Sequence, residues 1–200
     1  MKVLVACEYS GTVRDAFLER GHDAVSCDIL PTESPGPHYE GDIVDILWGE
    51  EQWDLMIAHP PCTHLSVSGA RWFTEGKKPL YLREDALEFV QFLMDAPIHR
   101  ICIENPVSVI ASHIRKSDQM IHPWQFGHPE EKRTCLWLKN LPKLVPTNNV
   151  HEHMMTLPNS ERQRIWSMPP SADRGKLRSL FYDGFAEAMA EQWGQLEEEK

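Results

Sequence analysis

The hydrophobic positions in the first half of this chain form short continuous runs, separated by stretches with helical spacing. The runs KVLVAC, DAVSCDIL, WDLMIAH and HRICIEN are apolar and β-prone, and each predicts a strand. These strands are expected over 2–7, 23–30, 53–59 and 99–105. Between them, apolar residues at helical spacing predict helices over 12–21 and 83–96. A short strand or turn is expected at 41–46, and irregular structure at 34–39.

The pattern is weaker in the second half. A strand at 134–138 and a closing helix over 180–196 are its clear elements. Residues 139–177 are rich in proline and polar side chains, so we expect at most one short helix there. The terminal residues 194–200 are expected to fray into solvent. Because continuous apolar strands alternate with helices, we predict one α/β domain over 1–200, with a mostly parallel sheet covered on both faces.

The composition is that of a globular protein, with 42% hydrophobic and 25% charged residues. No apolar stretch approaches the roughly 20 residues that cross a bilayer, so we expect no membrane span. Five cysteines without framework spacing predict reduced thiols and a cytoplasmic location. The formal net charge of -10 argues against indiscriminate DNA binding, although HIRKS, EEKRT and ADRGKLRS allow a local basic groove.

Polar residues gather where the predicted strands end, in CEYSG, at Asp28, in HPPC and in IENP. In an open parallel sheet the ligand lies beyond the carboxyl ends of the strands, so these segments predict the binding site. The CEYSG loop contains only Gly11, which fits either a tight turn or a loop that cradles a nucleotide-like ligand. It lacks the glycine fingerprint of a nicotinamide-dependent enzyme. Asp28 fits either a site for ribose hydroxyls or a helix N-cap.

Cys62 stands in a different context from the other cysteines. Those within apolar runs are expected to be buried, namely Cys7, Cys27, Cys102 and Cys135. Two prolines precede Cys62 and small polar residues follow it, so we expect it to be exposed at the functional end of the sheet. A zinc site with His59 or His64 would need paired ligands at longer spacing, and we predict no metal. Glu104 fits either a general acid beside Cys62 or a carboxyl satisfied by local backbone N–H groups.

Several motifs, taken in order, resemble those of the cytosine-C5 DNA methyltransferase family. PPCTHLSVSG resembles the nucleophile motif P-C-Q-x-F-S, and ENPVSVIASH resembles the E-N-V motif. EGDIVDI, HPEEKRTCLWL and RSLFYDGFAEAMAEQW are similar to the donor-binding, arginine and closing-helix segments. The resemblance is to short phage and prophage forms that lack a large target-recognition domain. It implies a Rossmann-like methyltransferase domain that uses S-adenosylmethionine and methylates carbon 5 of a cytosine flipped out of DNA, through a covalent Cys62 adduct.

The resemblance also implies roles for individual residues. Cys62 would be the nucleophile, and Glu104 would hydrogen-bond the pyrimidine at N3 and the exocyclic amine. The residues expected to bind the cofactor are Cys7, Glu8, Tyr9, Ser10, Gly11, Asp28, Ile29, Asp42, Ile43 and Pro60. Those expected to bind the base or a phosphate are Ser66, Arg71, Asn105, Lys132 and Arg133.

The chain departs from the family pattern in its loop, its nucleophile motif and its arginine motif. Tyr9 replaces a glycine of the first motif, and Thr63 replaces the glutamine after the nucleophile. Lys132 and Thr134 replace the two arginines. Only the reduced segment 139–177 corresponds to a recognition domain. Two alternatives therefore stay open: the same chemistry on a free pyrimidine nucleotide, or a catalytically silent protein that binds S-adenosylmethionine or acts as a DNA decoy.

Overall fold

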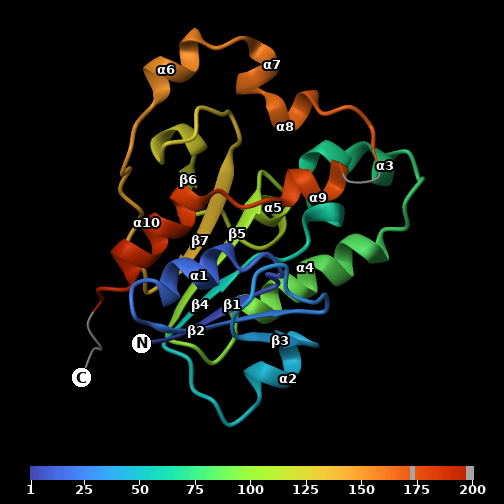
Figure 1. Ribbon diagram of the computed structural model, residues 1–200. Coiled ribbons are helices and arrows are strands. Elements are labelled where there is room, and N and C mark those ends of the chain that lie inside the picture. The colour runs from blue at the N-terminus through green and yellow to red at the C-terminus, as the bar shows by residue number, and fades with distance from the viewer. Residues whose placement is uncertain (172–173, 197–200) are drawn as a thin grey trace.

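The computed structural model describes residues 1–171 and 174–196 (Figure 1). Residues 197–200 of the tail expected to fray, and 172–173 of the segment expected to be irregular, lie outside the described residues. Within the described part of the chain, the strands form one seven-stranded sheet in the order β3-β2-β1-β4-β5-β7-β6. Their bounds are β1 Lys2–Ala6, β2 Asp23–Asp28, β3 His38–Glu40, β4 Leu55–Ala58, β5 Arg100–Pro106, β6 Gln119–Ile121 and β7 Thr134–Lys139.

Strands β1 to β5 run parallel to one another, whereas β7 runs antiparallel to both β5 and β6. At the centre, Val3 of β1 pairs with Ala24 of β2 on one side and with Leu55 of β4 on the other. This order confirms the predicted mostly parallel, Rossmann-like α/β fold, and its reversed β7 is typical of methyltransferase domains. The parallel strands end at a common edge, where the predicted site residues follow.

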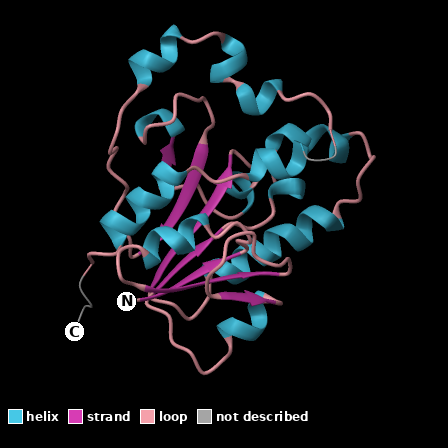
Figure 2. Ribbon diagram, viewed as in Figure 1, coloured by secondary structure: helices cyan, strands magenta, loops and turns pink. Residues whose placement is uncertain are grey.

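Helices cover both faces of the sheet (Figure 2). The helices that follow the strands are α1 Thr12–Leu18, α2 Ile43–Leu47, α4 Tyr81–Met94, α5 Ile110–His113 and α10 Asp183–Trp193, and the short helix α3 Ala70–Thr74 lies in the segment between β4 and α4. Val3 and Val5 belong to the core with α1 and α10, whereas Leu4 and Ala6 belong to the core with α2, α4 and α5. Neighbouring residues of a strand point to opposite faces of the sheet, and each face carries an apolar core. Successive positions of these strands are therefore mostly apolar, which explains the continuous hydrophobic runs in the sequence.

The structure corrects three local predictions. Residues 41–46, predicted as a strand or turn, lead into helix α2, because the Asp42 carboxylate caps it by accepting a hydrogen bond from the Val44 N–H at 2.9 Å. Residues 34–39, predicted to be irregular, include the start of strand β3. The edge strand β6 has no counterpart among the predicted elements, since three residues are too few to show an alternation.

The segment 139–177 contains more helix than predicted. Its short helices are α6 His151–Thr156, α7 Asn159–Arg162, α8 Arg164–Ser167 and α9 Arg174–Ser179. In Figure 1 the first three follow one another in an arc at the top of the view, away from β2 and β3. Met154 and Ile165 are the buried residues of α6 and α8, so neither helix has enough apolar positions to show a period in the sequence. No helix in the described part of the chain is long and apolar enough to span a membrane.

Candidate active site

The loop between β1 and α1 is closed by its own carboxylate. Cys7 and Gly11 both have left-handed backbone angles, with φ of 58° and 80°. They turn the chain so that the buried Glu8 carboxylate accepts hydrogen bonds from the N–H groups of Val13 at 2.7 Å and Arg14 at 3.2 Å. Burial raises the pKa of Glu8. The start of α1 therefore has no free N–H groups at these positions for a ligand phosphate.

Arg14 gives Gly11 a second reason to be glycine, which the sequence analysis did not foresee. The Arg14 side chain is fully buried, and its guanidinium donates to the Ser26 hydroxyl at 3.2 Å and to the Ser34 carbonyl at 3.0 Å. A Cβ on Gly11 would overlap this guanidinium, and one on Gly36 would lie 2.7 Å from it. Both glycines thus allow a close approach to a cation that organises the loop after β2. The only signal in the sequence was a charged residue between apolar helix positions.

Asp28 and Asp42 meet around the end of β1. Both carboxylates raise the pKa of the Cys7 thiol, after the larger effect of burial. Asp28 ends β2 and accepts a hydrogen bond from the Leu30 N–H at 3.0 Å, and the next side chain, Ile29, is 76% exposed. Asp42 caps α2. An acidic residue and an apolar surface therefore lie together beside the Glu8 loop. Of the remaining residues predicted to bind the cofactor, Tyr9 and Ser10 are partly buried in this loop, Ile43 is buried in the core and Pro60 is buried beyond β4.

Cys62 lies in a short 3-10 turn just beyond β4, and it is partly buried rather than exposed as predicted. The turn is tied to the neighbouring strand, because the Asn105 side-chain amide donates to the Pro60 carbonyl at 2.8 Å. Burial raises the pKa of the Cys62 thiol, and the Glu104 carboxylate adds to this effect. The cations of Lys132 and Arg178 act in the opposite direction. The predicted nucleophile and its predicted carboxyl partner are thus brought together. The expected burial of the other cysteines is confirmed for three of them, while Cys7 is partly exposed.

Glu104 has a side-chain partner that the sequence analysis did not assign to it. One of its oxygens, Oε2, lies 3.0 Å from Nδ1 of His59, and the two side chains are only 12% and 14% exposed. The His59 ring also packs edge-on against Phe181, at 4.7 Å between ring centroids. Among the described residues, no cluster of three or more His, Cys, Asp or Glu side chains could hold a metal ion.

Lys132 lies near Cys62 and Glu104. The other residues predicted to bind substrate are spread over several segments of the chain. The Lys132 ammonium donates to the carbonyls of Arg178 and Leu180, at 3.2 and 3.4 Å. Burial lowers its pKa, while Glu104 and Cys62 raise it. Arg133 is exposed and helps lower the pKa of His122, after the larger effect of burial.

Ser66 and Arg71 follow Cys62 along the chain, and the backbone of Ser66 forms an isolated β-bridge with Ser108 in the segment after β5. The Ser66 hydroxyl accepts a hydrogen bond from the Ser68 N–H at 3.4 Å, and the Arg71 guanidinium lies 4.5 Å from the Trp72 ring. Arg178, on α9, was not among the predicted site residues, since sequence motifs cannot show that a distant helix returns to the site.

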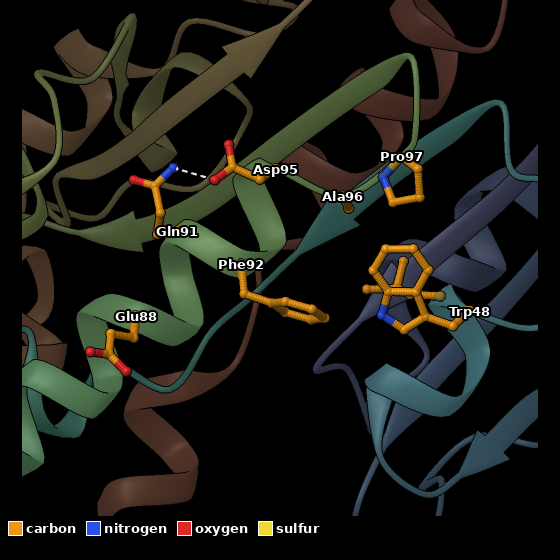
Figure 3. A pocket seen from close by; sticks show the side chains of 8 residues that line it. Trp48, Glu88, Gln91, Phe92, Asp95, Ala96 and Pro97 are labelled. Carbon is orange, nitrogen blue, oxygen red and sulfur yellow. Dashed lines mark hydrogen bonds between the residues drawn. The ribbon is translucent and has the colours of Figure 1, made fainter.

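A separate cavity lies near the amino ends of the strands, opposite the ends that carry the candidate active site. Figure 3 shows the cavity, of about 470 Å³, between Trp48 at the end of α2 and Phe92 on α4, with Glu88 and Asp95 at its rim. The ends of α2 and α4 lead into the starts of β4 and β5, so this cavity lies away from the carboxyl ends that carry Cys62. It forms no part of the candidate active site.

Solved structures of other proteins resemble this fold, among them one from E. coli and one from Entamoeba histolytica. One is a prophage-encoded protein of E. coli, provisionally named a DNA modification methyltransferase, with 14% identity and a TM-score of 0.47 over 80% of this chain and 56% of that one. The other is the Entamoeba histolytica methyltransferase EhMeth, with 15% identity and a TM-score of 0.47 over 74% and 57%. The chain thus spans little more than half the length of these proteins. Neither a protein-family model nor a curated protein matches the sequence.

Proposed function

We propose that this chain is an S-adenosylmethionine-dependent methyltransferase that acts on carbon 5 of cytosine in DNA, with Cys62 as its nucleophile. The proposal is carried by the meeting of a thiol, a carboxyl and a partly buried ammonium at the carboxyl ends of β4 and β5, where Glu104 and Lys132 act in opposite directions on the pKa of Cys62. Since many functions share one fold, it rests on these side chains rather than on the sheet order alone.

The loop beside this group fits the methyl donor. When bound, S-adenosylmethionine would supply an activated methyl group. Its adenosine carries no phosphate, which suits a loop whose first helical N–H groups are taken by Glu8. The Asp28 carboxylate would accept hydrogen bonds from the ribose hydroxyls, and Ile29 would cover one face of the adenine. A nicotinamide dinucleotide would instead bring a pyrophosphate toward a carboxylate.

The site residues divide the reaction between them. Carbon 5 of cytosine is a weak nucleophile, so a bond from the Cys62 sulfur to carbon 6 would make the ring an enamine that takes the methyl group at carbon 5. Glu104 would hydrogen-bond N3 and the exocyclic amine, stabilising the charge that develops there. Loss of the carbon-5 proton to a base would then break the sulfur–carbon bond and release Cys62. Lys132 would favour the thiolate before attack.

Basic and aromatic side chains after Cys62 favour a nucleic acid as substrate. Arg71 and Lys77 lie 4.5 and 4.9 Å from the Trp72 ring, and Arg83 lies 4.1 Å from the Phe73 ring. A cytosine in a duplex would have to be flipped out before Cys62 could reach it. The net charge of -10 and the small segment 139–177 favour the alternative, a free pyrimidine nucleotide. The salt dependence of binding separates the two, because phosphate contacts give a steep slope.

The decisive experiment is the capture of a covalent adduct. Incubation with S-adenosylmethionine and DNA that contains 5-fluorocytosine should yield a protein–DNA adduct, because fluorine at carbon 5 prevents release. Cys62→Ala should abolish the adduct but keep donor binding, and Cys135→Ala, which changes a buried cysteine on β7, should retain it. Absence of the adduct in wild-type protein that binds the donor would refute the proposal. Mass spectrometry of bases in DNA, RNA and nucleotide pools would then identify any other substrate.

A further inference from the structure

His59 stands next to the proposed catalytic carboxyl, although the motifs assign it no catalytic role. It directly follows β4, and its backbone N–H donates to the Ala6 carbonyl on β1 at 2.9 Å. Because β4 lies between β1 and β5, the His59 side chain can reach Glu8, which follows β1, and Glu104, which lies near the carboxyl end of β5. It hydrogen-bonds Glu104 and interacts electrostatically with Glu8.

We propose that His59 is a positioning residue for Glu104, which determines the carboxyl oxygen that faces the pyrimidine; this rests on the proposed function. The 3.0 Å contact between Nδ1 and Oε2 occupies one oxygen of Glu104. The edge-on contact with Phe181, at 4.7 Å and 62°, fixes the plane of the ring. A ring held from two sides keeps the carboxyl from rotating freely.

The surroundings of the second ring nitrogen determine where the imidazole carries its proton. Nε2 of His59 is buried and has no hydrogen-bond partner among residues 1–171 and 174–196. A proton on Nε2 of the neutral ring would be buried without an acceptor, which is unfavourable, whereas a proton on Nδ1 is donated to Glu104. The neutral ring therefore carries its proton on Nδ1, and Oε2 of Glu104 accepts it.

This arrangement has a consequence for the reacting ring. Since Oε2 accepts a hydrogen bond from His59, the opposite oxygen, Oε1, is the one left to donate to N3, while a second lone pair of Oε2 can accept from the exocyclic amine. When Glu104 carries a proton, that proton resides on Oε1, which faces the substrate. Without His59 the carboxyl would present either oxygen in several orientations, and misplacement of a catalytic group by about 1 Å can cost on the order of 100-fold in rate. The loss should fall on kcat and spare donor binding.

Three substitutions separate positioning from packing. His59→Asn keeps an N–H near the place of Nδ1, His59→Gln keeps one near the place of Nε2, and His59→Phe keeps only a ring against Phe181. We expect the Asn variant to retain kcat within about 10-fold, and the Gln and Phe variants to lose about 100-fold. The affinity for S-adenosylmethionine should stay within about twofold of wild type in all three. His22→Asn, which changes a partly buried histidine beside Phe17 before β2, is the control and should leave kcat unchanged.

The position of the proton is measured without catalysis. ¹⁵N NMR of imidazole-labelled protein should show a neutral ring protonated on Nδ1, assigned as the signal that disappears in His59→Asn. A neutral ring protonated on Nε2, or equal loss of kcat in the Asn and Gln variants, would overturn the proposal. The Asn and Gln pair decides the kinetic question even if the Phe variant does not fold. Wild-type protein without any methyl transfer would instead refute the proposed function, while the NMR spectrum would still report whether His59 donates to Glu104.

Discussion

The hydrogen bond from Asn105 to the Pro60 carbonyl makes a testable contribution to stability. Asn105→Leu replaces the amide with an apolar group of similar size, so it opens little space but removes the donor. The Pro60 carbonyl, 2.8 Å from the amide in the native protein, would lose its partner in a buried setting. An acceptor left unsatisfied costs about 1–3 kcal/mol. For a protein of this length each kcal/mol lowers Tm by about 2–4 °C, so we expect Tm to fall by roughly 2–12 °C.

Urea unfolding provides the measurement. The midpoint should fall while the m-value stays constant, because the change removes a native contact and leaves the unfolded chain alone. The exposed Gln52 offers a matched control, since Gln52→Leu makes a similar change away from the site. A free energy of unfolding for Asn105→Leu within about 0.5 kcal/mol of that control would refute the reasoning. If the bond holds the turn, alkylation of Cys62 should also become faster.

Three further changes have expected outcomes with a defined sign. Gly184→Ala should lower the free energy of unfolding in urea by roughly 1–3 kcal/mol or more, because its Cβ would overlap the main-chain carbonyl oxygen of a neighbouring loop. The control Gly175→Ala, in the open helix α9, should be neutral or stabilise the protein by up to about 1 kcal/mol. Equal effects of the two substitutions would contradict this reasoning. Burial raises the pKa of Glu8 above its ordinary 4.5, so the folded protein binds the proton of this carboxyl more tightly than the unfolded chain does. The contribution of that proton to the free energy of unfolding is therefore lost as pH rises through the pKa of the folded protein. Glu8→Gln should therefore match wild type below pH 4.5 and gain stability relative to it as pH rises, and a difference that is constant with pH would count against the argument. Lys132→Met should raise the pKa of Cys62 further and slow its alkylation near neutral pH, measured by mass spectrometry of the labelled peptide, and an unchanged or faster rate would exclude a role for this cation.

The elements that could be predicted are those whose sequence pattern has one physical cause. Strands β1, β4 and β5 are buried on both faces, so their continuous apolar runs predict them correctly. Helix α10 shows the helical period because one face packs on the sheet, with Phe185 and Trp193 buried. Helix α2 was missed because one short apolar run fits a strand or a helix, and the cap made by Asp42 decides between them.

The site was predictable where strand order brings residues together, and obscure where side chains meet through folding of distant segments. Cys62 lies just beyond β4, and Glu104 lies near the carboxyl end of the neighbouring parallel strand β5, so their proximity could be expected from the alternating pattern. The contact of His59 with Phe181 depends on the return of a segment more than one hundred residues away, which no local pattern records. The buried position of Arg14 likewise depends on its partners in the loop after β2.

The carboxylate that closes the first loop also bears on competition inside a cell. Adenine nucleotides such as ATP share the nucleoside of the proposed donor, and a site that read only adenine and ribose would bind them as well. Glu8 stands at the start of α1, where nucleotide-binding proteins often hold phosphates, and when ionised it repels a phosphate tail. One internal anion would thus serve as a filter that favours a cationic sulfonium over the phosphorylated relatives of the same nucleoside.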